Sequence, residues 1–341
     1  MAKKTLNIAV IGCGAMASAH MTGIRTKEGA CLYAICDPDV ERLTKRKEEH
    51  NPQIAVTDYR ELVNDPNVDA AVIVLPDKLH LPVTKAFLEA GKHVMCEKPM
   101  ALKPEACEEM IRAEKASGKK LMIGQVCRFT PGFVLAKDLV DAGRIGELVF
   151  VESEYAHSYA KSPGHNGWRV DPDRHGFIGG GCHAVDLLRW IAGNPTEVYA
   201  HANHKILTDW PVDDTSIAIY QFPNNVMGKV FVSIGCRRNY TMRTVLYGTK
   251  GTIICDNTSK EILLYENDPV DENAYKFPKS LPVVINNHNV VAEIDQFVDA
   301  ILEDRDMPCT SVEGASTVAV CYATVQSTKI GKPVEIQYPQ V

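Results

Sequence analysis

The stretch that decides the fold is LNIAVIGCGAMA, residues 6–17. Its first half is an unbroken apolar run, which is typical of a strand that is buried on both faces. Its second half has the GxGxxA pattern and leads directly into a helix that we expect to end near Arg25. Strand, glycine-rich turn and helix in this order are the fingerprint of a dinucleotide-binding fold.

Each small residue of this turn has a physical reason to be there. Gly12 permits a tight turn, Gly14 lets the backbone approach a pyrophosphate, and Ala17 allows the helix to pack closely. The start of the helix offers free N–H groups and the positive end of the helix dipole to phosphate oxygens. The cofactor-binding residues expected in the turn are Gly12, Gly14, Ala15 and Met16.

Asp37 directly follows the next apolar run, residues 31–36. A carboxylate at this place accepts hydrogen bonds from both ribose hydroxyls and repels a 2′-phosphate. NAD is therefore favoured over NADP, although the nearby Arg42 leaves NADP as a second option. A purely structural interpretation, with Asp37 as a helix N-cap and Gly12 as a plain turn, explains the same residues without a ligand.

The chain alternates strand and helix patterns in its first third and then changes to longer strand patterns. The alternation predicts a doubly wound parallel sheet, the Rossmann arrangement, for residues 1–124. The later strands alternate apolar and polar residues, which predicts an α+β domain with a mostly antiparallel open sheet for residues 125–341. The expected strands are residues 6–11, 31–36, 70–75, 93–96 and 121–126, then 147–155, 197–204, 215–222, 226–234 and 244–247. Two late helices are expected at residues 290–302 and after the capping box Thr310-Ser311-Val312-Glu313.

Composition excludes several classes of protein. The 341 residues carry 37 Lys and Arg against 43 Asp and Glu, a formal net charge of −6. The basic residues are scattered, so the chain has no electrostatic footprint for nucleic acid or an anionic membrane. No apolar run reaches the roughly 18 residues that a membrane span needs, and the 11 cysteines show no CxxC spacing. We therefore expect a cytoplasmic protein with reduced thiols and no metal site.

A second candidate site follows the expected strand at residues 93–96, which runs into Glu97-Lys98-Pro99. This tripeptide falls at the carboxyl end of the parallel sheet, where ligands of open α/β folds bind. A lysine there can donate a hydrogen bond to a substrate oxygen and stabilise the charge that develops as an alcohol loses its proton. A solvated surface lysine is the alternative interpretation of Lys98.

Further motifs extend over nearly the whole chain. They are the GxGxxA turn, Asp37, Leu75-Pro76-Asp77-Lys78-Leu79-His80, Glu97-Lys98-Pro99, Arg128-Phe129, Gly143-Arg144-Ile145-Gly146-Glu147, Trp168-Arg169, His183 with Asp186, and Gly248-Thr249-Lys250-Gly251-Thr252. Together they resemble the glucose-fructose oxidoreductase and inositol dehydrogenase family, also called Gfo/Idh/MocA. The resemblance implies NAD or NADP as cofactor, sugars, inositols or related polyols as substrates, and a homodimer or homotetramer in which subunits cover the open sheet.

The resemblance also implies roles for individual residues. Lys98 matches the catalytic lysine, and Pro99 matches a proline that follows a cis bond. Pro76 and His80 would lie on the nicotinamide side, and Glu97 would touch the ribose. The full set of implied contacts outside the glycine-rich turn is Leu75, Pro76, His80, Glu97, Lys98 and Arg169 for the cofactor, with Arg128 and Trp168 bordering the substrate.

The match breaks just before His183. Relatives commonly carry an Asp four residues before this helix-starting histidine, as proton acceptor and substrate ligand, whereas this chain has Gly179 in Ile178-Gly179-Gly180-Gly181. Three glycines would let the backbone approach a ligand. A neutral His183 could itself accept a hydroxyl proton, with His175 and Asp173 as candidate replacements for the missing acid. The alternative role for His183 is a structural one at the start of the helix.

Three functions are compatible with these residues. The leading hypothesis is reversible hydride transfer between a secondary alcohol of a sugar, inositol or polyol and NAD, in which Lys98 polarises the oxygen and His183 exchanges its proton. In the second, bound NAD supports a transient oxidation for elimination or glycoside cleavage without net redox change. The third is a non-catalytic NAD or sugar sensor, which the missing carboxylate motivates. The expected substrate-side residues are Lys98, Arg128, Tyr155, His157, Trp168, His175 and His183, with Tyr159, His165 and His288 as further candidates.

Overall fold

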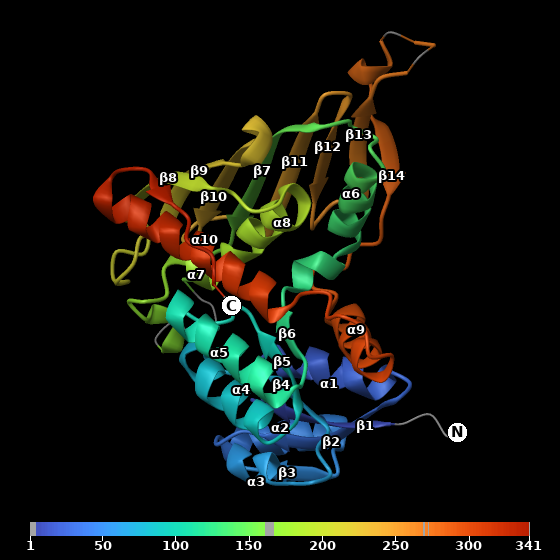
Figure 1. Cartoon of the computed structure of the whole chain (residues 1–341), viewed down its shortest axis with the longest axis vertical. Coiled ribbons are helices and arrows are strands. Elements are labelled where there is room, and N and C mark those ends of the chain that lie inside the picture. Colours follow the sequence, from blue (N-terminus) through green and yellow to red (C-terminus); the bar gives the residue numbers. More distant parts are fainter. Residues whose placement is uncertain (1–4, 161–166, 269, 272, 341) are drawn as a thin grey trace. The chain divides into compact units, whose positions relative to one another are not determined.

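The computed structural model describes residues 5–160, 167–268, 270, 271 and 273–340. These residues form two compact units, coloured along the chain in Figure 1. The first unit comprises the chain up to Gln125, the segment Val290–Ala315 and the chain from Pro339. The second comprises Val126–Asn289 and Ser316–Tyr338. Our expectation of one domain at residues 125–341 did not include the return of Val290–Ala315 to the first unit.

The first unit is built on a six-stranded parallel sheet in the order β3-β2-β1-β4-β5-β6. Its strands are β1 (Leu6–Ile11), β2 (Ala30–Cys36), β3 (Ile54–Val56), β4 (Ala70–Ile73), β5 (His93–Glu97) and β6 (Leu121–Gly124). Its helices are α1 (Ala17–Thr26), α2 (Val40–His50), α3 (Tyr59–Val63), α4 (His80–Glu89), α5 (Pro104–Ser117) and α9 (Val290–Leu302). The predicted Rossmann arrangement is confirmed, and the strand order reverses between β1 and β4, which is where such sheets bind dinucleotides.

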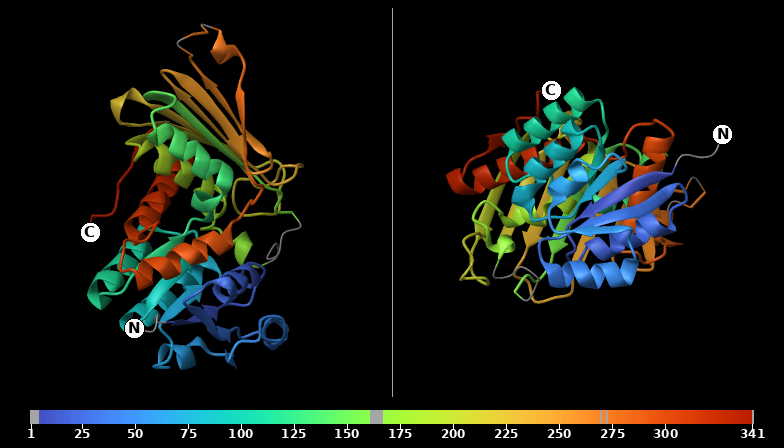
Figure 2. Two further views of the ribbon diagram at one scale, coloured as in Figure 1. Left: turned by 90° about the vertical axis from the view of Figure 1, so that its right-hand side faces the viewer. Right: turned by 90° about the horizontal axis from the view of Figure 1, so that it is seen from below.

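The central strands are buried because helices cover both faces of this sheet. All of β4 and nearly all of β1 is inaccessible to solvent, in agreement with their unbroken apolar sequences. Helix α4 packs against α5, while α1 packs against α2 and α9, and Figure 2 shows helices on the two sides of the parallel strands. This layering leaves the carboxyl ends of the strands as the place where polar turns gather.

The second unit contains a nine-stranded sheet in the order β14-β13-β12-β11-β7-β10-β9-β8-β15. Its strands are β7 (Leu148–Ala156), β8 (Glu197–Asn203), β9 (Thr215–Gln221), β10 (Met227–Ser233), β11 (Thr241–Gly248), β12 (Gly251–Asp256), β13 (Glu261–Glu266), β14 (Lys279–Pro282) and β15 (Val334–Glu335). Its helices are α6 (Pro131–Asp141), α7 (Gly176–Gly179), α8 (Cys182–Ala192) and most of α10 (Ser311–Ile330). Strands β7 and β10 pair in parallel and the other described neighbours are antiparallel, so the predicted mostly antiparallel sheet is confirmed.

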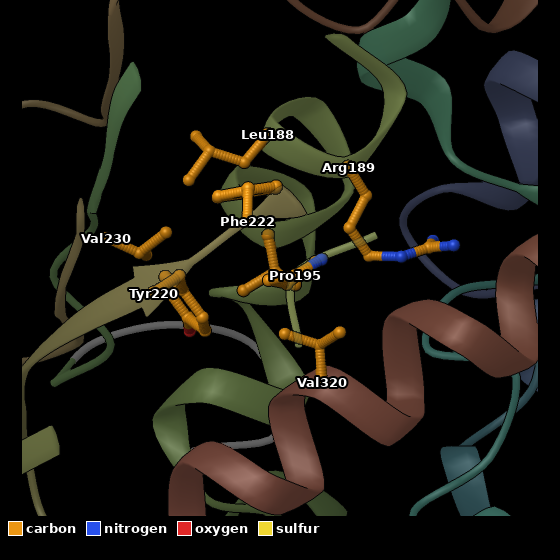
Figure 3. A pocket seen from close by; sticks show the side chains of 8 residues that line it. Leu188, Arg189, Pro195, Tyr220, Phe222, Val230 and Val320 are labelled. Atoms are coloured by element: carbon orange, nitrogen blue, oxygen red, sulfur yellow. The ribbon is translucent and has the colours of Figure 1, made fainter. Parts of the chain in front are cut away.

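Helices α6, α8 and α10 cover one face of this sheet (Figure 2). Figure 3 shows the apolar layer that results, in which side chains of α8, β9, β10 and α10 converge and leave no space for a water molecule. On the opposite face the strands alternate, and large apolar side chains point to solvent. They include Tyr199, Ile217, Ile219, Met227 and Tyr247.

Three further expectations concern the chain as a whole. The capping box at the start of α10 is formed, because the amide of Glu313 donates to the Thr310 hydroxyl at 3.2 Å and the amide of Thr310 donates to the Glu313 carboxylate at 2.9 Å. All 11 cysteines are free thiols. Among the described helices, none combines the length and the apolar character that crossing a membrane would require.

Candidate active site

The glycine-rich turn after β1 has a conformation that only glycine tolerates at its first position. Gly12 has φ +103°, and a Cβ there would collide with the Val74 carbonyl, 2.9 Å from its carbon atom. The turns after β1 and β4 therefore touch backbone to backbone at the switch point. At Gly14, in contrast, a Cβ would meet no atom within 4 Å, so the space in front of this residue is open.

The N-terminus of helix α1, next to this open space, has neither a side-chain cap nor a negative charge nearby in its first turn. Met16 is its N-cap, makes no side-chain capping hydrogen bond, and no acidic residue occupies the first turn. The first N–H groups of a helix lack intrahelical partners, and the helix dipole makes them attractive to an anion. The residues present therefore fit a dinucleotide, whose pyrophosphate the turn of Gly12, Gly14, Ala15 and Met16 would hold.

Asp37 fixes the other side of this turn. Its side chain is almost fully buried, and it accepts hydrogen bonds from the amides of Cys13 at 2.8 Å and Asp39 at 2.9 Å. The half-exposed Arg42 donates to the same carboxylate at 3.1 Å. Arg42 also donates from its Nε at 3.4 Å, so four donors meet the roughly four lone-pair sites of the carboxylate. Ribose hydroxyls would therefore have to replace the half-exposed Arg42, while the two backbone amides keep holding the loop.

His80 connects the two polar turns that follow β4 and β5. The ring is fully buried, its Nδ1 lies 2.9 Å from the Pro99 carbonyl oxygen, and its Nε2 lies 2.9 Å from the Leu75 carbonyl oxygen. Both ring nitrogens can donate only in the imidazolium form. Burial opposes this charge, but the Cys96 sulfur, Asp77 and the Leu75 carbonyl outweigh it and raise the pKa of His80 to about 10. The structure shows His80 supporting the turns on either side, and its expected position on the nicotinamide side stays a prediction.

We predict that His80→Gln lowers the free energy of unfolding by about 2 kcal/mol at pH 6, because buried carbonyl oxygens lose their donor. A folded-state pKa of about 10 lies above the ordinary value near 6.5, so the stabilisation is complete below pH ~6.5 and is lost as pH rises towards 10. Urea unfolding at pH 6, 8 and 10 measures the shrinking difference between variant and parent.

The matched control for this experiment is His50→Gln. His50 is also buried in the first unit, but burial lowers its pKa, so it is uncharged in both states above pH 6.5. The His50→Gln difference should stay constant between pH 7 and 10. If the difference in free energy of unfolding between His80→Gln and the parent also stayed constant with pH, His80 would not be a cation between the two carbonyl oxygens.

The turn after β5 combines a buried carboxylate with an available ammonium. One oxygen of Glu97 lies 2.8 Å from Nε2 of His20, and the other accepts from the Lys98 amide at 3.2 Å. Burial opposes ionisation of Glu97, but His20 and the Lys98 charge outweigh it and hold the pKa of Glu97 below its ordinary value. The Lys98 side chain is half-buried, no described residue accepts a hydrogen bond from its ammonium, and the Lys98–Pro99 peptide is cis as the resemblance implied. The turn thus offers an ammonium whose donors no described residue uses.

The second unit gathers aromatic and imidazole rings around the end of β7. Each ring centroid lies between 4.8 and 6.5 Å from at least one other. The rings belong to Tyr155, His157, Tyr159, His183, Tyr240 and His288. Three of the sequence-predicted substrate residues, Tyr155, His157 and His183, are therefore brought together, as are the further candidates Tyr159 and His288.

Hydrogen bonds order the phenols of this cluster. The Tyr155 hydroxyl lies 2.8 Å from the Tyr159 hydroxyl and 3.1 Å from Nδ1 of His157, and the Tyr240 hydroxyl lies 3.2 Å from Nε2 of His288. Burial raises the pKa of Tyr155 and of Tyr240 well above the ordinary value. The phenols therefore remain protonated donors, and the imidazoles are the groups of the cluster that can accept a proton near neutral pH.

His183 lies at the second residue of α8 and is buried. Its ring stacks on Tyr155 with centroids 6.0 Å apart and an interplanar angle of 26°, and its Nδ1 lies 3.5 Å from the Cys127 sulfur. Sequence reasoning missed Tyr240 and gave little weight to His288. The pairing of Met242 with Tyr155 places Tyr240 just beyond the end of the same strand pair, and this register is not readable from the sequence.

Protein side chains fill the space beside the three glycines that precede α8. A Cβ on Gly179 would lie 2.5 Å from the guanidinium carbon of Arg174, and one on Gly180 would lie 2.5 Å from Cε1 of Tyr155. Arg174 is buried, donates to the Gly179 carbonyl at 3.0 Å, and lies 4.8 Å from the Trp168 ring centroid. A buried cation therefore lies where a side chain at position 179 would begin, and the expected approach of this backbone to a ligand stays a prediction.

Several other expected site residues have structural partners. Arg128 is buried and makes a bidentate pair with Asp186 at 2.7 and 2.9 Å, which favours a bracing role over substrate binding. His175 is buried, and its Nδ1 accepts from the Phe177 amide at 3.2 Å as the cap of α7. Its other nitrogen lies 3.7 Å from Asp213, and this contact lowers the pKa of that carboxyl.

The remaining predicted residues lie at the edge of the ring cluster, in an exposed turn, or outside the described residues. Arg169 lies over the Tyr159 ring at 5.3 Å and over the Trp168 ring at 4.5 Å, and Trp168 itself is partly exposed. The amide of Asp173 donates to the Asp171 carboxylate in an exposed turn. His165 lies outside the described residues.

Comparisons with known proteins agree with this geometry. A family model described as "Oxidoreductase family, NAD-binding Rossmann fold" matches residues 6–125, and the "GFO/IDH/MocA C-terminal domain" matches residues 133–254. The chain is 30% identical to inositol 2-dehydrogenase 2 of Saccharopolyspora erythraea, over 97% of this chain and 96% of that protein. It is 26% identical to myo-inositol 2-dehydrogenase of Thermotoga maritima, over 97% and 99%. A solved NAD binding oxidoreductase from Klebsiella pneumoniae is 26% identical with a TM-score of 0.88, covering 98% of this chain and 100% of that one.

Proposed function

Because this chain belongs to the Gfo/Idh/MocA oxidoreductase family, whose first domain is an NAD-binding Rossmann fold, we propose that it is an NAD-dependent dehydrogenase that oxidises a secondary alcohol of an inositol or a related polyol or sugar. The observation that carries this proposal is Lys98, a half-buried ammonium whose donors no described residue uses, at the carboxyl end of the parallel sheet. The inositol dehydrogenases among its relatives support the substrate class.

The proposed mechanism gives different roles to Lys98 and His183. Lys98 donates a hydrogen bond to the substrate oxygen and stabilises the negative charge that develops on it. His183 accepts the hydroxyl proton as a neutral imidazole, and the Tyr155 phenol beneath its ring stays protonated and orients substrate hydroxyls. NAD, when bound, supplies the hydride acceptor.

We predict that Lys98→Met lowers kcat by about a thousandfold, in the range of a lost general acid or oxyanion donor. Nicotinamide absorbance with a panel of inositols, polyols and sugars measures the rate, and NAD binding by the variant confirms that it is folded. Lys115→Met, which removes an exposed lysine of α5, is the control and should retain the parent's rate. Equal turnover by Lys98→Met would remove the assignment.

NAD is the proposed cofactor in preference to NADP because Asp37 is a buried carboxylate where the adenosine ribose would lie. We predict that Asp37→Ser lowers the ratio of kcat/KM for NAD to that for NADP by at least about tenfold, the effect of roughly 1.4 kcal/mol. Any loosening of the turn at Cys13 should change kcat/KM for both cofactors equally, because both would bind at this turn. It therefore cancels in the ratio. Adding Arg42→Ala should abolish the gain with NADP, because Arg42 is then no longer there to bind the 2′-phosphate; an unchanged ratio in Asp37→Ser would refute the assignment.

A second candidate function is favoured by Arg174 at the place of the missing carboxylate. A buried guanidinium suits a substrate or intermediate with negative charge, as in an enzyme that oxidises its substrate transiently to acidify a neighbouring C–H bond. Such an enzyme would release a leaving group while NAD remains catalytic. The dehydrogenase assay distinguishes the two, because only a dehydrogenase accumulates one reduced nicotinamide for each product.

We also propose that the chain forms a homo-oligomer through the uncovered face of the nine-stranded sheet, where Ile217, Ile219 and Met227 are exposed on neighbouring strands. Ile219→Lys should shift the protein towards monomer in light scattering across a concentration series. Val284→Lys, which changes an exposed apolar residue after β14, should leave the mass unchanged. A monomeric parent, or equal assembly by Ile219→Lys, would refute this surface.

A further inference from the structure

The first unit contains a carboxyl group that the proposed reaction does not use. Glu293 lies in the first turn of α9, is 0% exposed, and neither of its oxygens has a hydrogen-bond partner. An unpaired ionised carboxylate in the interior costs several kcal/mol, whereas an apolar residue of the same size would not. Packing therefore does not explain why this position carries a glutamate.

Glu293 reaches the turn that carries Lys98. Gly124 is the partner of Glu97 in the β5–β6 register, and a Cβ on Gly124 would lie 3.4 Å from Cα of Glu97 and 3.6 Å from Oε1 of Glu293. The missing side chain at Gly124 thus leaves space in which the Glu293 carboxyl approaches the carboxyl end of β5.

Helix α9 is held firmly in this position. A Cβ on Gly23 of α1 would lie 3.1 Å from the Cβ of Ile294, so the two helices pack with almost no gap. Lys27 pairs with Asp299 at 2.7 Å and ties the last turn of α9 to the end of α1. Both contacts lie within the first unit, where Figure 1 shows α1 and α9 side by side.

The surroundings of Glu293 and Glu97 favour a protonated Glu293 and an ionised Glu97. Burial, and after it the charge of Glu97, raises the pKa of Glu293 well above its ordinary value, and Lys98 opposes this only in part. Glu97 keeps a pKa below its ordinary value through His20 and Lys98. On α9 itself, Asp295 is half-exposed and Asp299 is paired, so neither offers Glu293 a counter-charge. Two neighbouring buried carboxyls separate in this way because ionising both would bring two negative charges into one buried environment.

We propose that Glu293 is a positioning residue for the Lys98 ammonium: its buried carboxyl lies behind the Glu97–Lys98 turn without a hydrogen-bond partner among the described residues, and it leaves Glu97 as the carboxylate of this turn. If Glu293 lost its proton, a second carboxylate would draw the ammonium inward and away from a substrate oxygen. The inference deepens the proposed function and rests on it for the role of Lys98, but the protonation of Glu293 does not depend on it.

The first experiment tests protonation without any assay of activity. Infrared spectra of the parent at pH 7 should contain the C=O stretch of a protonated carboxyl, and Glu293→Gln should lose it. Glu109→Gln is the control, because this exposed carboxylate pairs with Lys85 and its lowered pKa keeps it ionised. An equal C=O band in the parent and in Glu293→Gln would overturn the inference, whatever reaction the protein catalyses.

The second experiment tests the effect on Lys98. Glu293→Gln removes the ionisable group at nearly constant size, so it should retain kcat within about threefold at pH 7, while the alkaline limb of its pH profile moves to higher pH. Glu293→Leu also lacks an ionisable group, so it should show the same shift of the alkaline limb with KM for NAD unchanged, and it should be as stable as the parent or more stable. The positioning role would be wrong if the alkaline limb did not move in these variants. It would also be wrong if both variants lost activity only in proportion to a fall in melting temperature.

The two experiments separate the failure of this inference from the failure of the proposed function. If Lys98→Met were fully active, the dehydrogenase mechanism would fall while the infrared result still decided the state of Glu293. If Lys98→Met were inactive but Glu293→Gln and Glu293→Leu both kept the parent's pH profile, the mechanism would stand and the positioning role would fall.

Discussion

The candidate site in the first unit depends on one buried imidazole between two carbonyl oxygens. His80 joins the Leu75 carbonyl after β4 to the Pro99 carbonyl after β5. Parallel strands end at the same edge of a sheet, but their turns are irregular and need side chains to satisfy their backbone groups. This ring meets that need for two turns at once, and it thereby fixes the backbone from which Lys98 projects.

Buried polar groups of this kind recur wherever the fold departs from regular structure. Asp37 holds the phosphate-binding turn through the Cys13 amide, and Asp186 is fully paired with Arg128 and Thr317 in the second unit. Such groups are costly to leave unsatisfied and costly to break. They give the loops a single conformation, which a catalytic or binding residue on a loop requires.

The first unit could be read from the sequence because its signals are local. An apolar run, a GxGxxA turn and an acidic residue after the next strand each lie within a short segment, and β1, α1 and Asp37 were therefore anticipated. The ring cluster of the second unit depends on strand register and on loops that are distant in sequence, so Tyr240 was missed and His288 was underrated. Arg174 was also missed, because only the fold shows that its guanidinium fills the space beside Gly179.

The path of the chain has a consequence for how this protein can be divided. Helix α9 belongs to the first unit although it follows the whole nine-stranded sheet in sequence, and it contributes Ile294 and Phe297, both 0% exposed, to that unit's core. A fragment that stopped at Gln125 would contain the complete parallel sheet, yet it would expose the apolar surface of α1 that α9 covers. Isolating the nucleotide-binding half would therefore require a fusion that restores the late helix, not a simple truncation.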